Sequence, residues 1–470
     1  MNAAEKNLDC TAKIDASCRV PLLVLFNGAA VALVFGLLCS LIASLTFHNP
    51  ELTAHCPCMT YGHAIAAAND LLVFGFAIPA ALGVMLWIFA RLSQAELQLP
   101  IVPFVAAHLW HLGVLVGTIG ILTGNSSGYQ WLEYPRAAAA LLGVTFVLIA
   151  ISAFATFGLR KERELYPSHW FLLAALLWFP WIYSSANLFL GSTHPVRGVA
   201  QSVINWWFAD NLIFVWLALV GLGVAFYFLP KIANRPLHSR FYALFAFWTL
   251  ILFGTWLGIP AGAPVPAWLP AASQFASLLM IIPIIAVAVI LKNILWRANV
   301  ACFGGNYCYI RFGSVMFLVS ALMLGAAGCP EYSRTVEFTW FGPAQVQLQI
   351  LGFATMILLG AIYEIIPRVM GTALPFGKLV NLQFFASMLG TLLLVISLAV
   401  AGVKQGKANF DPAAAKFWLQ MSTGGIALLL LGSLALLLNL LVMTLKWKLG
   451  LVKTVIATVT APLPNTEVKS

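Results

Sequence analysis

Twelve separate stretches of this chain are apolar over about twenty residues, the length that an α-helix needs to cross the hydrocarbon core of a bilayer. They lie at residues 20–47, 61–90, 101–124, 137–159, 169–192, 202–229, 241–259, 268–295, 309–328, 344–367, 379–402 and 417–445. Only short connections separate them, which favours one bundle over separate domains. We predict an all-α integral membrane protein with about twelve helices at 20–447, an N-terminal tail at 1–19 and a C-terminal tail at 448–470.

The composition excludes a soluble globular protein. Hydrophobic residues make up 61% of the chain and charged residues only 9%, whereas soluble domains carry about 25% charged residues. The first nineteen residues are polar and charged, unlike a cleaved signal peptide. The first apolar stretch is therefore predicted to stay as a membrane helix, with the lipid bilayer as the surrounding solvent.

The net charge of +10 indicates membrane orientation rather than nucleic-acid binding, because the basic residues stand singly in short loops. Cytoplasmic loops carry an excess of Lys and Arg. With a cytoplasmic N-terminus, the basic residues on the opposite side are only Arg136, Arg197, Arg334, Lys404, Lys407 and Lys416. The sequence thus predicts a multi-pass protein with both termini in the cytoplasm and no nucleic-acid partner.

Three acidic residues fall inside the predicted spans, where ionisable groups are costly and so mark functional candidates. Asp70 lies on the second span, and Asp210 on the sixth, where it must be protonated, paired or in a wet cavity. Glu364 on the tenth span precedes Arg368 by four residues. It is predicted to form a helical ion pair with Arg368, with a proton-entry carboxylate as the functional alternative.

Three histidines in the spans are further candidates. His63 begins the second span and is predicted either to ligate a haem or metal, or to hydrogen-bond at the headgroup boundary. His108 and His111 are three residues apart on the third span. Their spacing suits a metal only if other helices add ligands, so hydrogen bonds between helices are the favoured interpretation.

His55, Cys56 and Cys58 form a short motif in the first loop. Two cysteines separated by one residue are too close for an unstrained disulfide with each other, and they supply only part of a metal shell. A partial metal site and a disulfide from one of them to Cys329 both remain open.

Motifs along the whole chain resemble subunit I of the haem–copper oxidase superfamily, in particular the cbb3-type cytochrome c oxidases and the related nitric oxide reductases. The motifs are Trp206-Trp207-Phe208-x-x-Asn211, Tyr227-Phe228-x-Pro230-Lys231, Arg235-Pro236-Leu237, Phe247-Trp248, Trp256-x-Gly258, Phe338-Thr339, Leu351-Gly352-Phe353 and Gly360-Ala361-Ile362-Tyr363-x-x-x-Pro367-Arg368. The resemblance implies a respiratory or electron-transfer complex in the bacterial cytoplasmic (inner) membrane, with a membrane-anchored cytochrome c or other respiratory subunits as partners.

The ligand positions that this resemblance implies are mostly changed. His63 is similar to the family's low-spin haem ligand, but the His-x-His pair of the tenth helix falls on Gln345 and Gln347. A copper-ligating histidine falls on Asp210, and the adjacent copper histidines fall near Pro260-Ala261. The seventh-helix tyrosine associated with oxygen chemistry falls on Gly254. A glutamine amide is a poor substitute for imidazole, and proline and alanine cannot ligate copper through a side chain.

Five of the six histidine ligands that the resemblance implies are therefore absent. We predict a scaffold subunit, a pseudoenzyme without the binuclear centre, without intrinsic oxidase activity and without cofactors. Three alternatives remain. One is an electron-transfer subunit with one haem b at His63. Another is a proton or small-molecule transporter lined by Asp70, Asp210, Gln345 and Gln347. The last is a divergent oxygen or nitric oxide reductase that uses Asp210 as a metal ligand.

Overall fold

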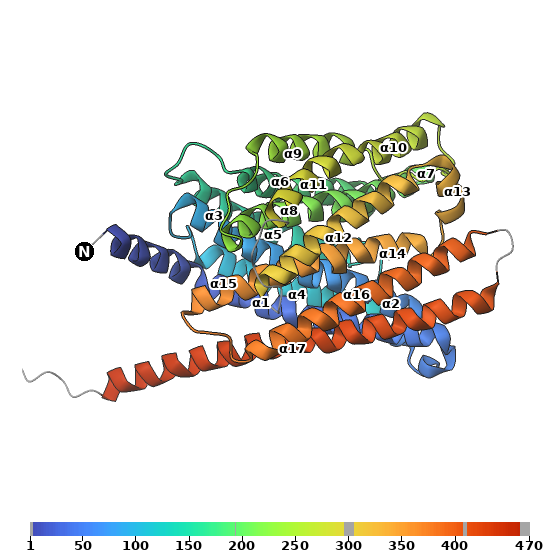
Figure 1. The fold of residues 1–470 in the computed structure, drawn as a ribbon. Helices are drawn as coiled ribbons and strands as arrows, with labels where there is room; N and C mark the ends of the chain where they lie inside the picture. Colours follow the sequence, from blue (N-terminus) through green and yellow to red (C-terminus); the bar gives the residue numbers. More distant parts are fainter. Residues whose placement is uncertain (1–2, 193, 296–304, 408–410, 461–470) are drawn as a thin grey trace, which may run out of the picture.

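The computed structural model describes residues 3–192, 194–295, 305–407 and 411–460, and these residues form helices and loops without any β-strand. Figure 1 shows the helices running along a common direction. They are α1 (Ala3–His48), α2 (Tyr61–Asp70), α3 (Ile78–Ser93), α4 (Ile101–Leu122), α5 (Arg136–Gly158), α6 (Pro167–Gly191), α7 (Val199–Asp210), α8 (Leu217–Ile232), α9 (Arg240–Gly254), α10 (Trp268–Leu279), α11 (Ile281–Leu295), α12 (Asn306–Ala327), α13 (Pro330–Val336), α14 (Phe341–Gln347), α15 (Met356–Met370), α16 (Gly377–Gln405) and α17 (Pro412–Thr460).

Eleven helical segments of the described chain are long and apolar enough to cross a membrane. A shorter apolar helix, α9, corresponds to the seventh predicted span, so the predicted bundle of about twelve helices is confirmed. That helix ends at Gly254 rather than at residue 259, because the following segment to Pro264 is rich in glycine and proline. The predicted N-terminal tail is helical from Ala3, and α17 continues through the predicted C-terminal tail to Thr460.

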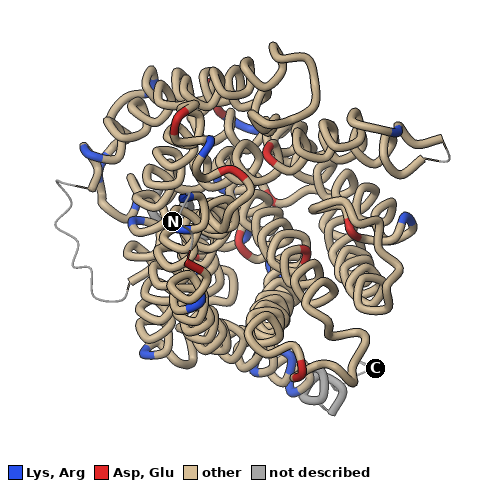
Figure 2. The backbone as a smooth tube through the Cα atoms, turned by 90° about the vertical axis from the view of Figure 1, so that its right-hand side faces the viewer, with Lys and Arg blue, Asp and Glu red and all other residues tan. Residues whose placement is uncertain are grey.

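The first and last helices, α1 and α17, have their outer ends at the same end of the bundle. The start of α1 and the end of α17 are together on the left in Figure 1. We call the opposite end the far end; it contains the loop between α1 and α2, the loop between α4 and α5, and helix α13. Figure 2 looks along the bundle and shows how sparse the charged residues are, as a membrane environment requires.

Three spans form the centre of the bundle. They are Tyr61–Ser93, Val199–Ile232 and Phe341–Met370, and the most apolar parts of the first two are completely buried. In the most apolar parts of the remaining spans, about half of the residues are buried and the others face outward, as expected for helices that face lipid or partner subunits. Asp70 on the second span and Gln345 on the tenth are buried, and Asp210 on the sixth and Gln347 on the tenth are half-buried.

Each central span contains a π-helical segment, in which the backbone hydrogen bonds reach five residues instead of four. These segments are η3 (Leu71–Ala77), η4 (Asn211–Trp216) and η5 (Leu348–Thr355), and η5 packs against both of the others. They begin directly after Asp70, after Asp210 and after Gln347, respectively. π-helical turns in proteins often occur at functional sites. The polar residues directly before these three segments are therefore candidates for a functional site.

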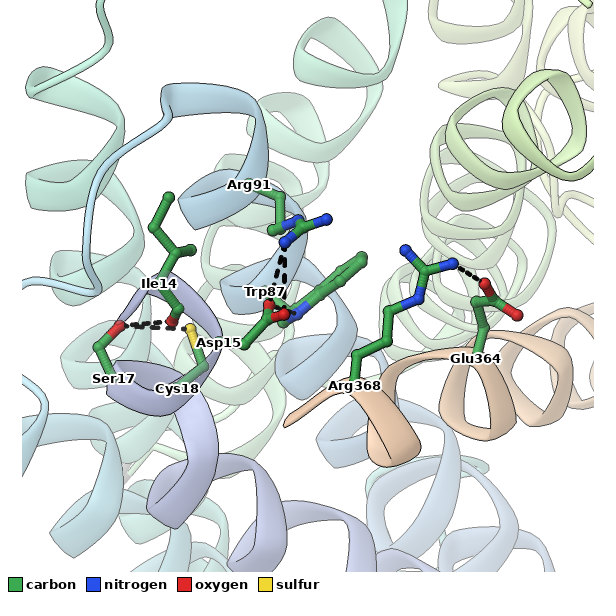
Figure 3. A network of polar contacts seen from close by, with 8 residues as sticks. All are labelled: Ile14, Asp15, Ser17, Cys18, Trp87, Arg91, Glu364 and Arg368. Atoms are coloured by element: carbon green, nitrogen blue, oxygen red, sulfur yellow. Dashed lines mark hydrogen bonds and ion pairs between the residues drawn. The ribbon is translucent and has the colours of Figure 1, made fainter. Parts of the chain in front are cut away.

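A polar network joins α1 to α3 at the end of the bundle that holds the N-terminus (Figure 3). Trp87 Nε1 donates a 2.8 Å hydrogen bond to Asp15 Oδ1, and Arg91 lies 3.3 Å from Asp15 Oδ2. Trp87 is fully buried, so its N–H needs this acceptor. The network fixes the position of α1 along α3, which belongs to the central span Tyr61–Ser93.

Candidate functional site

Gln345 and Gln347 lie on α14 and face two different cavities. Residues two apart on an α-helix point in nearly opposite directions, because each residue turns the helix by about 100°. Gln345 lines a cavity together with Asp210 and Pro260, which we call the polar cavity. Gln347 lines a second one, between α1, α2, α16 and α17, which we call the apolar cavity.

The polar cavity has a volume of about 370 Å³ and lies at the far end. It collects residues from α7, from the loop after α9, and from α10, α12, α13 and α14. The lining residues are Gln130, Trp206, Asp210, Gly258, Ile259, Pro260, Ala261, Ser273, Gln274, Ser277, Leu324, Ala327, Gly328, Ser333, Val336, Glu337, Phe338, Phe341, Gly342 and Gln345. All positions at which the family resemblance implies copper ligands, together with Gln345, thus converge on one space.

The loop after α9 is held in place by close backbone contacts. Gly258 has a φ angle of 109° and packs against the Trp206 backbone, where a Cβ atom would come within 2.6 Å of the carbonyl oxygen. Ile259 N donates to Ser273 Oγ at 3.1 Å. Ala261 N donates to Glu337 Oε1 at 2.7 Å. Only glycine combines this backbone conformation with this approach, so the wall of the polar cavity depends on it.

Asp210 has no hydrogen bond or ion pair with any other described residue, although it lies inside the bundle and lines the polar cavity. Glu337 is the other charged residue in the lining, and the lining contains no Lys or Arg. The Nε2 atom of Gln345 is buried without a hydrogen-bond partner in the described chain. Unsatisfied polar groups of this kind are costly in an apolar interior, which makes this cavity a candidate functional site.

The apolar cavity is smaller, about 100 Å³, and is lined mainly by leucine and aromatic side chains. Tyr61 and Ile65 reach it from α2. Its polar residues include His48, whose Nε2 atom lies 3.1 Å from Thr423 Oγ1, and Gln347, whose Oε1 atom is buried and unpartnered. The sequence analysis missed His48 and Thr423 because they lie near span ends, where polar residues are ordinary.

The residues around the two cavities do not fit a haem–copper centre. Copper and haem iron in such sites are held by imidazole groups, and the polar cavity offers a carboxyl group, a glutamine amide, Pro260 and Ala261. Within the described residues, no group of three or more His, Cys, Asp or Glu side chains is arranged to hold a metal ion. In the apolar cavity, His48 is engaged by Thr423, and Gln347 contributes an amide.

His63 does not meet the two glutamines. Its Nδ1 atom lies 3.0 Å from the carbonyl oxygen of Pro57, and its ring lies beside Gly124 in the loop between α4 and α5. Tyr61 lies two residues before His63 on α2 and Ile65 lies two residues after it, and both line the apolar cavity instead. His63 therefore faces the opposite side of α2 from Gln347.

Asp70 lies beside an acidic residue that the sequence analysis did not single out. Its carboxyl group is completely buried near that of Glu133 from the loop between α4 and α5, and neither Asp70 oxygen has a hydrogen-bond partner among the described residues. Burial raises the pKa of Glu133 to about 7, because it disfavours the charged form. Glu133 could have been noticed as a lone acid inside the apolar sequence Trp131-Leu132-Glu133-Tyr134. Such a carboxyl pair is stable when it holds a proton.

The other polar candidates lie apart from both cavities. Glu364 pairs with Arg368 and accepts a 2.7 Å hydrogen bond from Asn306 Nδ2, so the predicted helical ion pair is present (Figure 3). His108 is exposed and its Nδ1 atom lies 2.9 Å from the Phe104 carbonyl oxygen of its own helix. His111 packs against Gly28 of α1 instead. The two histidines do not converge on one site.

His55, Cys56 and Cys58 lie exposed in the loop between α1 and α2. The two sulfur atoms are 3.9 Å apart, and both thiols are free, as is that of Cys329. The structure therefore contains no disulfide from this motif to Cys329, and a metal site at the motif stays a prediction.

Comparison with known proteins identifies the same family over most of the chain. Residues 21–428 match the family "Cytochrome C and Quinol oxidase polypeptide I". A "Cbb3-type cytochrome c oxidase subunit CcoN1" of Stutzerimonas stutzeri is 25% identical over 378 residues, covering 76% of this chain and 77% of the relative. A "Cytochrome c oxidase subunit 1" of Rhodobacter capsulatus is 26% identical over 369 residues, covering 70% of this chain and 67% of the relative.

The fold agrees with this relationship. A chain of a solved heme-copper terminal oxidase dimer superposes with a TM-score of 0.73 and 13% sequence identity, covering 91% of this chain and 84% of that one. The matched residues 21–428 include all three central spans and the lining of the polar cavity. The chain is therefore a cytochrome c oxidase subunit I-like membrane protein and belongs to the Cytochrome C and Quinol oxidase polypeptide I family.

Proposed function

We propose that this protein is a catalytically degenerate scaffold subunit of a respiratory or electron-transfer complex. One observation carries the proposal: Asp210, Pro260, Ala261 and Gln345 line the same cavity and bring no imidazole to it. The family relationship explains why these positions meet, and the side chains explain why the chemistry of the family is not expected there.

A fold of this kind can be retained without its reaction because its stability comes from packing between helices. The central spans are buried by apolar contacts. The Asp15, Trp87 and Arg91 network joins α1 to α3, and Glu364, which pairs with Arg368 of its own helix, accepts a hydrogen bond from Asn306 of α12. None of these contacts involves the ligand positions. The bundle therefore keeps the outer surfaces on which partner subunits of an oxidase-like complex would dock.

The proposed setting is the bacterial inner membrane, with both termini in the cytoplasm and the two cavities toward the outer side. The positions of most Lys and Arg residues support this orientation. A membrane-anchored cytochrome c or another respiratory subunit is the proposed partner, since an oxidase subunit I-like chain without a redox centre needs haem-bearing neighbours to take part in electron transfer.

The experiment is affinity isolation of the tagged full chain from its native membrane with a mild detergent. We expect stoichiometric haem-bearing partner subunits to co-purify, and we expect deletion of the chain to disperse that complex on a native gel. An unrelated tagged membrane protein of the same host is the control. Isolation of the chain alone, with the haem proteins of the membrane still assembled after its deletion, would contradict the scaffold function.

Binding of a small solute is the second candidate function, and the unpaired Asp210 in the polar cavity favours it. The orientation of His63 toward Pro57 and Gly124 gives no corresponding support to a haem b at His63. A divergent reductase that uses Asp210 as a metal ligand lacks the additional ligands that such a metal needs.

A further inference from the structure

The charge of the polar cavity calls for a positively charged occupant. Among the residues that the structure describes, Asp210 and Glu337 are the charged ones that line the cavity. A carboxylate inside a membrane-embedded bundle is stable only when it is protonated, paired or solvated. A cation in the cavity would satisfy this requirement, whereas an anion would add to the repulsion.

The two carboxylates are not equivalent. Glu337 Oε1 accepts the hydrogen bond from Ala261 N and thereby holds the loop after α9. Asp210 has no hydrogen bond or ion pair with another described residue, and it comes at the end of α7, directly before the π-helical segment η4. Asp210 is therefore the group in the cavity that is free to bind a ligand.

The groups around Asp210 suit an organic cation better than a metal ion. Ca²⁺ takes six to eight oxygen ligands and zinc usually takes four ligands, but the described residues contain no group of three or more His, Cys, Asp or Glu side chains arranged for a metal. The cavity volume of about 370 Å³ is also far larger than a single ion needs. Trp206 lines the same space, and indole rings attract ammonium groups through their electron-rich faces.

We propose that the polar cavity binds a small organic ammonium ion, with Asp210 as its counter-ion and Trp206 as an aromatic wall. This site is additional to the scaffold function and can exist with or without a partner subunit. Its occupant would be excluded by a haem–copper centre, so ammonium binding and metal content are separate measurements on the same protein.

The ligand enters from the far end. Asn205 Nδ2 donates a 2.9 Å hydrogen bond to the Gln130 carbonyl oxygen, so the loop between α4 and α5 borders the cavity. Phe338 lies beside Gly262 at the rim with 76% of its surface exposed and with a positive φ of 57°, a strained conformation for an aromatic residue.

An ammonium group can come from a soluble amine or from the headgroup of phosphatidylethanolamine. Both place the same charge beside Asp210, so the experiment must separate them. The full-length protein is reconstituted in nanodiscs made of phosphatidylglycerol alone, and its thermal unfolding is followed during titration with isopropylammonium. Isopropanol, which has a similar shape and no charge, is the matched probe, and potassium ion is the inorganic one.

We expect isopropylammonium to raise the unfolding temperature in a saturable way, because a ligand that binds only the folded state stabilises it. Isopropanol and potassium should have no comparable effect. Asp210→Asn should weaken the apparent affinity by about tenfold or more, since hydrogen bonds to charged groups are worth about 1.5–3 kcal/mol. Trp206→Leu gives an independent variant with a smaller loss, and Glu364→Gln, at the other end of the bundle, should bind normally.

The second arm replaces part of the lipid with phosphatidylethanolamine. One outcome is that phosphatidylethanolamine stabilises the wild type but not Asp210→Asn, and abolishes the response of the wild type to isopropylammonium. This result would show that the lipid headgroup fills the same site. Equal responses to isopropanol or potassium would overturn the proposal. So would equal binding by the wild type and both cavity variants, or the absence of any response to the amine and to phosphatidylethanolamine.

Discussion

Gln345 and Gln347 stand back to back on α14, so that two residues of one helix separate the polar cavity from the apolar cavity. The family resemblance implies a His-x-His pair at these two positions, one ligand for each haem. The two side chains face different cavities, as a pair of ligands for two haems would, and both are amides, which are poor substitutes for imidazole. The fold of the family is thus retained, and the replacement of the implied histidines by Gln345 and Gln347 supports the proposed loss of haem binding.

The Asp70 and Glu133 pair should make stability depend on pH. The ordinary pKa of Glu133, 4.5, rises to about 7 on burial, so the folded state binds a proton more tightly than the unfolded state does. The resulting stabilisation is complete below pH 4.5 and is lost as the pH rises through 7. Glu133→Gln should flatten this dependence and stabilise the protein above pH 7 by roughly 1–2 kcal/mol, measured by unfolding at several pH values.

Glu164→Gln is the matched control for that experiment. Glu164 is an acid in another loop, and its pairing with Arg240 is exposed to solvent, so removal of its charge should leave the pH profile unchanged. A Glu133→Gln protein with the same profile as the wild type between pH 4.5 and 7 would show that the carboxyl pair does not hold the proton.

Asp15→Ala should destabilise the bundle by about 2–4 kcal/mol, because it leaves the buried N–H of Trp87 and the Arg91 guanidinium without their acceptor. Glu164→Ala breaks the exposed pair with Arg240 and should cost less than about 1 kcal/mol. Reversible unfolding in mixed micelles measures both. Equal effects of the two substitutions would mean that the network in Figure 3 adds nothing beyond a surface ion pair.

Neighbouring glycines on α17 should respond differently to alanine. A Cβ atom on Gly425 would lie 2.7 Å from the Gly390 carbonyl oxygen of α16, whereas one on Gly424 would meet its nearest neighbour, Leu393, at 3.7 Å. Gly425→Ala must push the helices apart and should cost about 1–3 kcal/mol. Gly424→Ala should be close to neutral. Thermal unfolding of the two variants provides the comparison, and a stable Gly425→Ala protein would refute the close packing of α16 and α17.

His63→Ala should leave any visible absorption of the purified protein unchanged, because His63 faces Pro57 and Gly124 rather than the cavities. His48→Ala is a useful companion, since His48 is the histidine in the lining of the apolar cavity. Loss of a haem spectrum in the His63 variant alone would support the single-haem alternative and contradict our interpretation of this residue.

The sequence predicted the spans well because hydropathy reports the bilayer directly. It also placed Asp210 and Gln345 correctly as interior residues, and the family resemblance explains why they meet. It could not reveal the π-helical segments. In a helix that is apolar on all sides, a turn with one extra residue leaves no break in the hydrophobic pattern.

The sequence also could not identify Glu337 as part of the polar cavity or Glu133 as part of the interior. Each lies in a loop, where an acid normally faces water. Their roles depend on distant partners, the Ala261 amide for Glu337 and the Asp70 carboxyl for Glu133. Contacts between loops that are far apart in the chain depend on how the helices that carry these loops pack together. Hydrophobic periodicity and charge do not predict this packing.

The haem and copper content of the purified chain tests the central claim most directly. The protein is isolated with its complex, separated from haem-bearing partners, and analysed by its pyridine haemochrome spectrum and by elemental analysis for copper, each normalised to the amount of chain. The absence of imidazole from the polar cavity predicts neither haem nor copper in stoichiometric amount. Two haems and one copper ion per chain would contradict it.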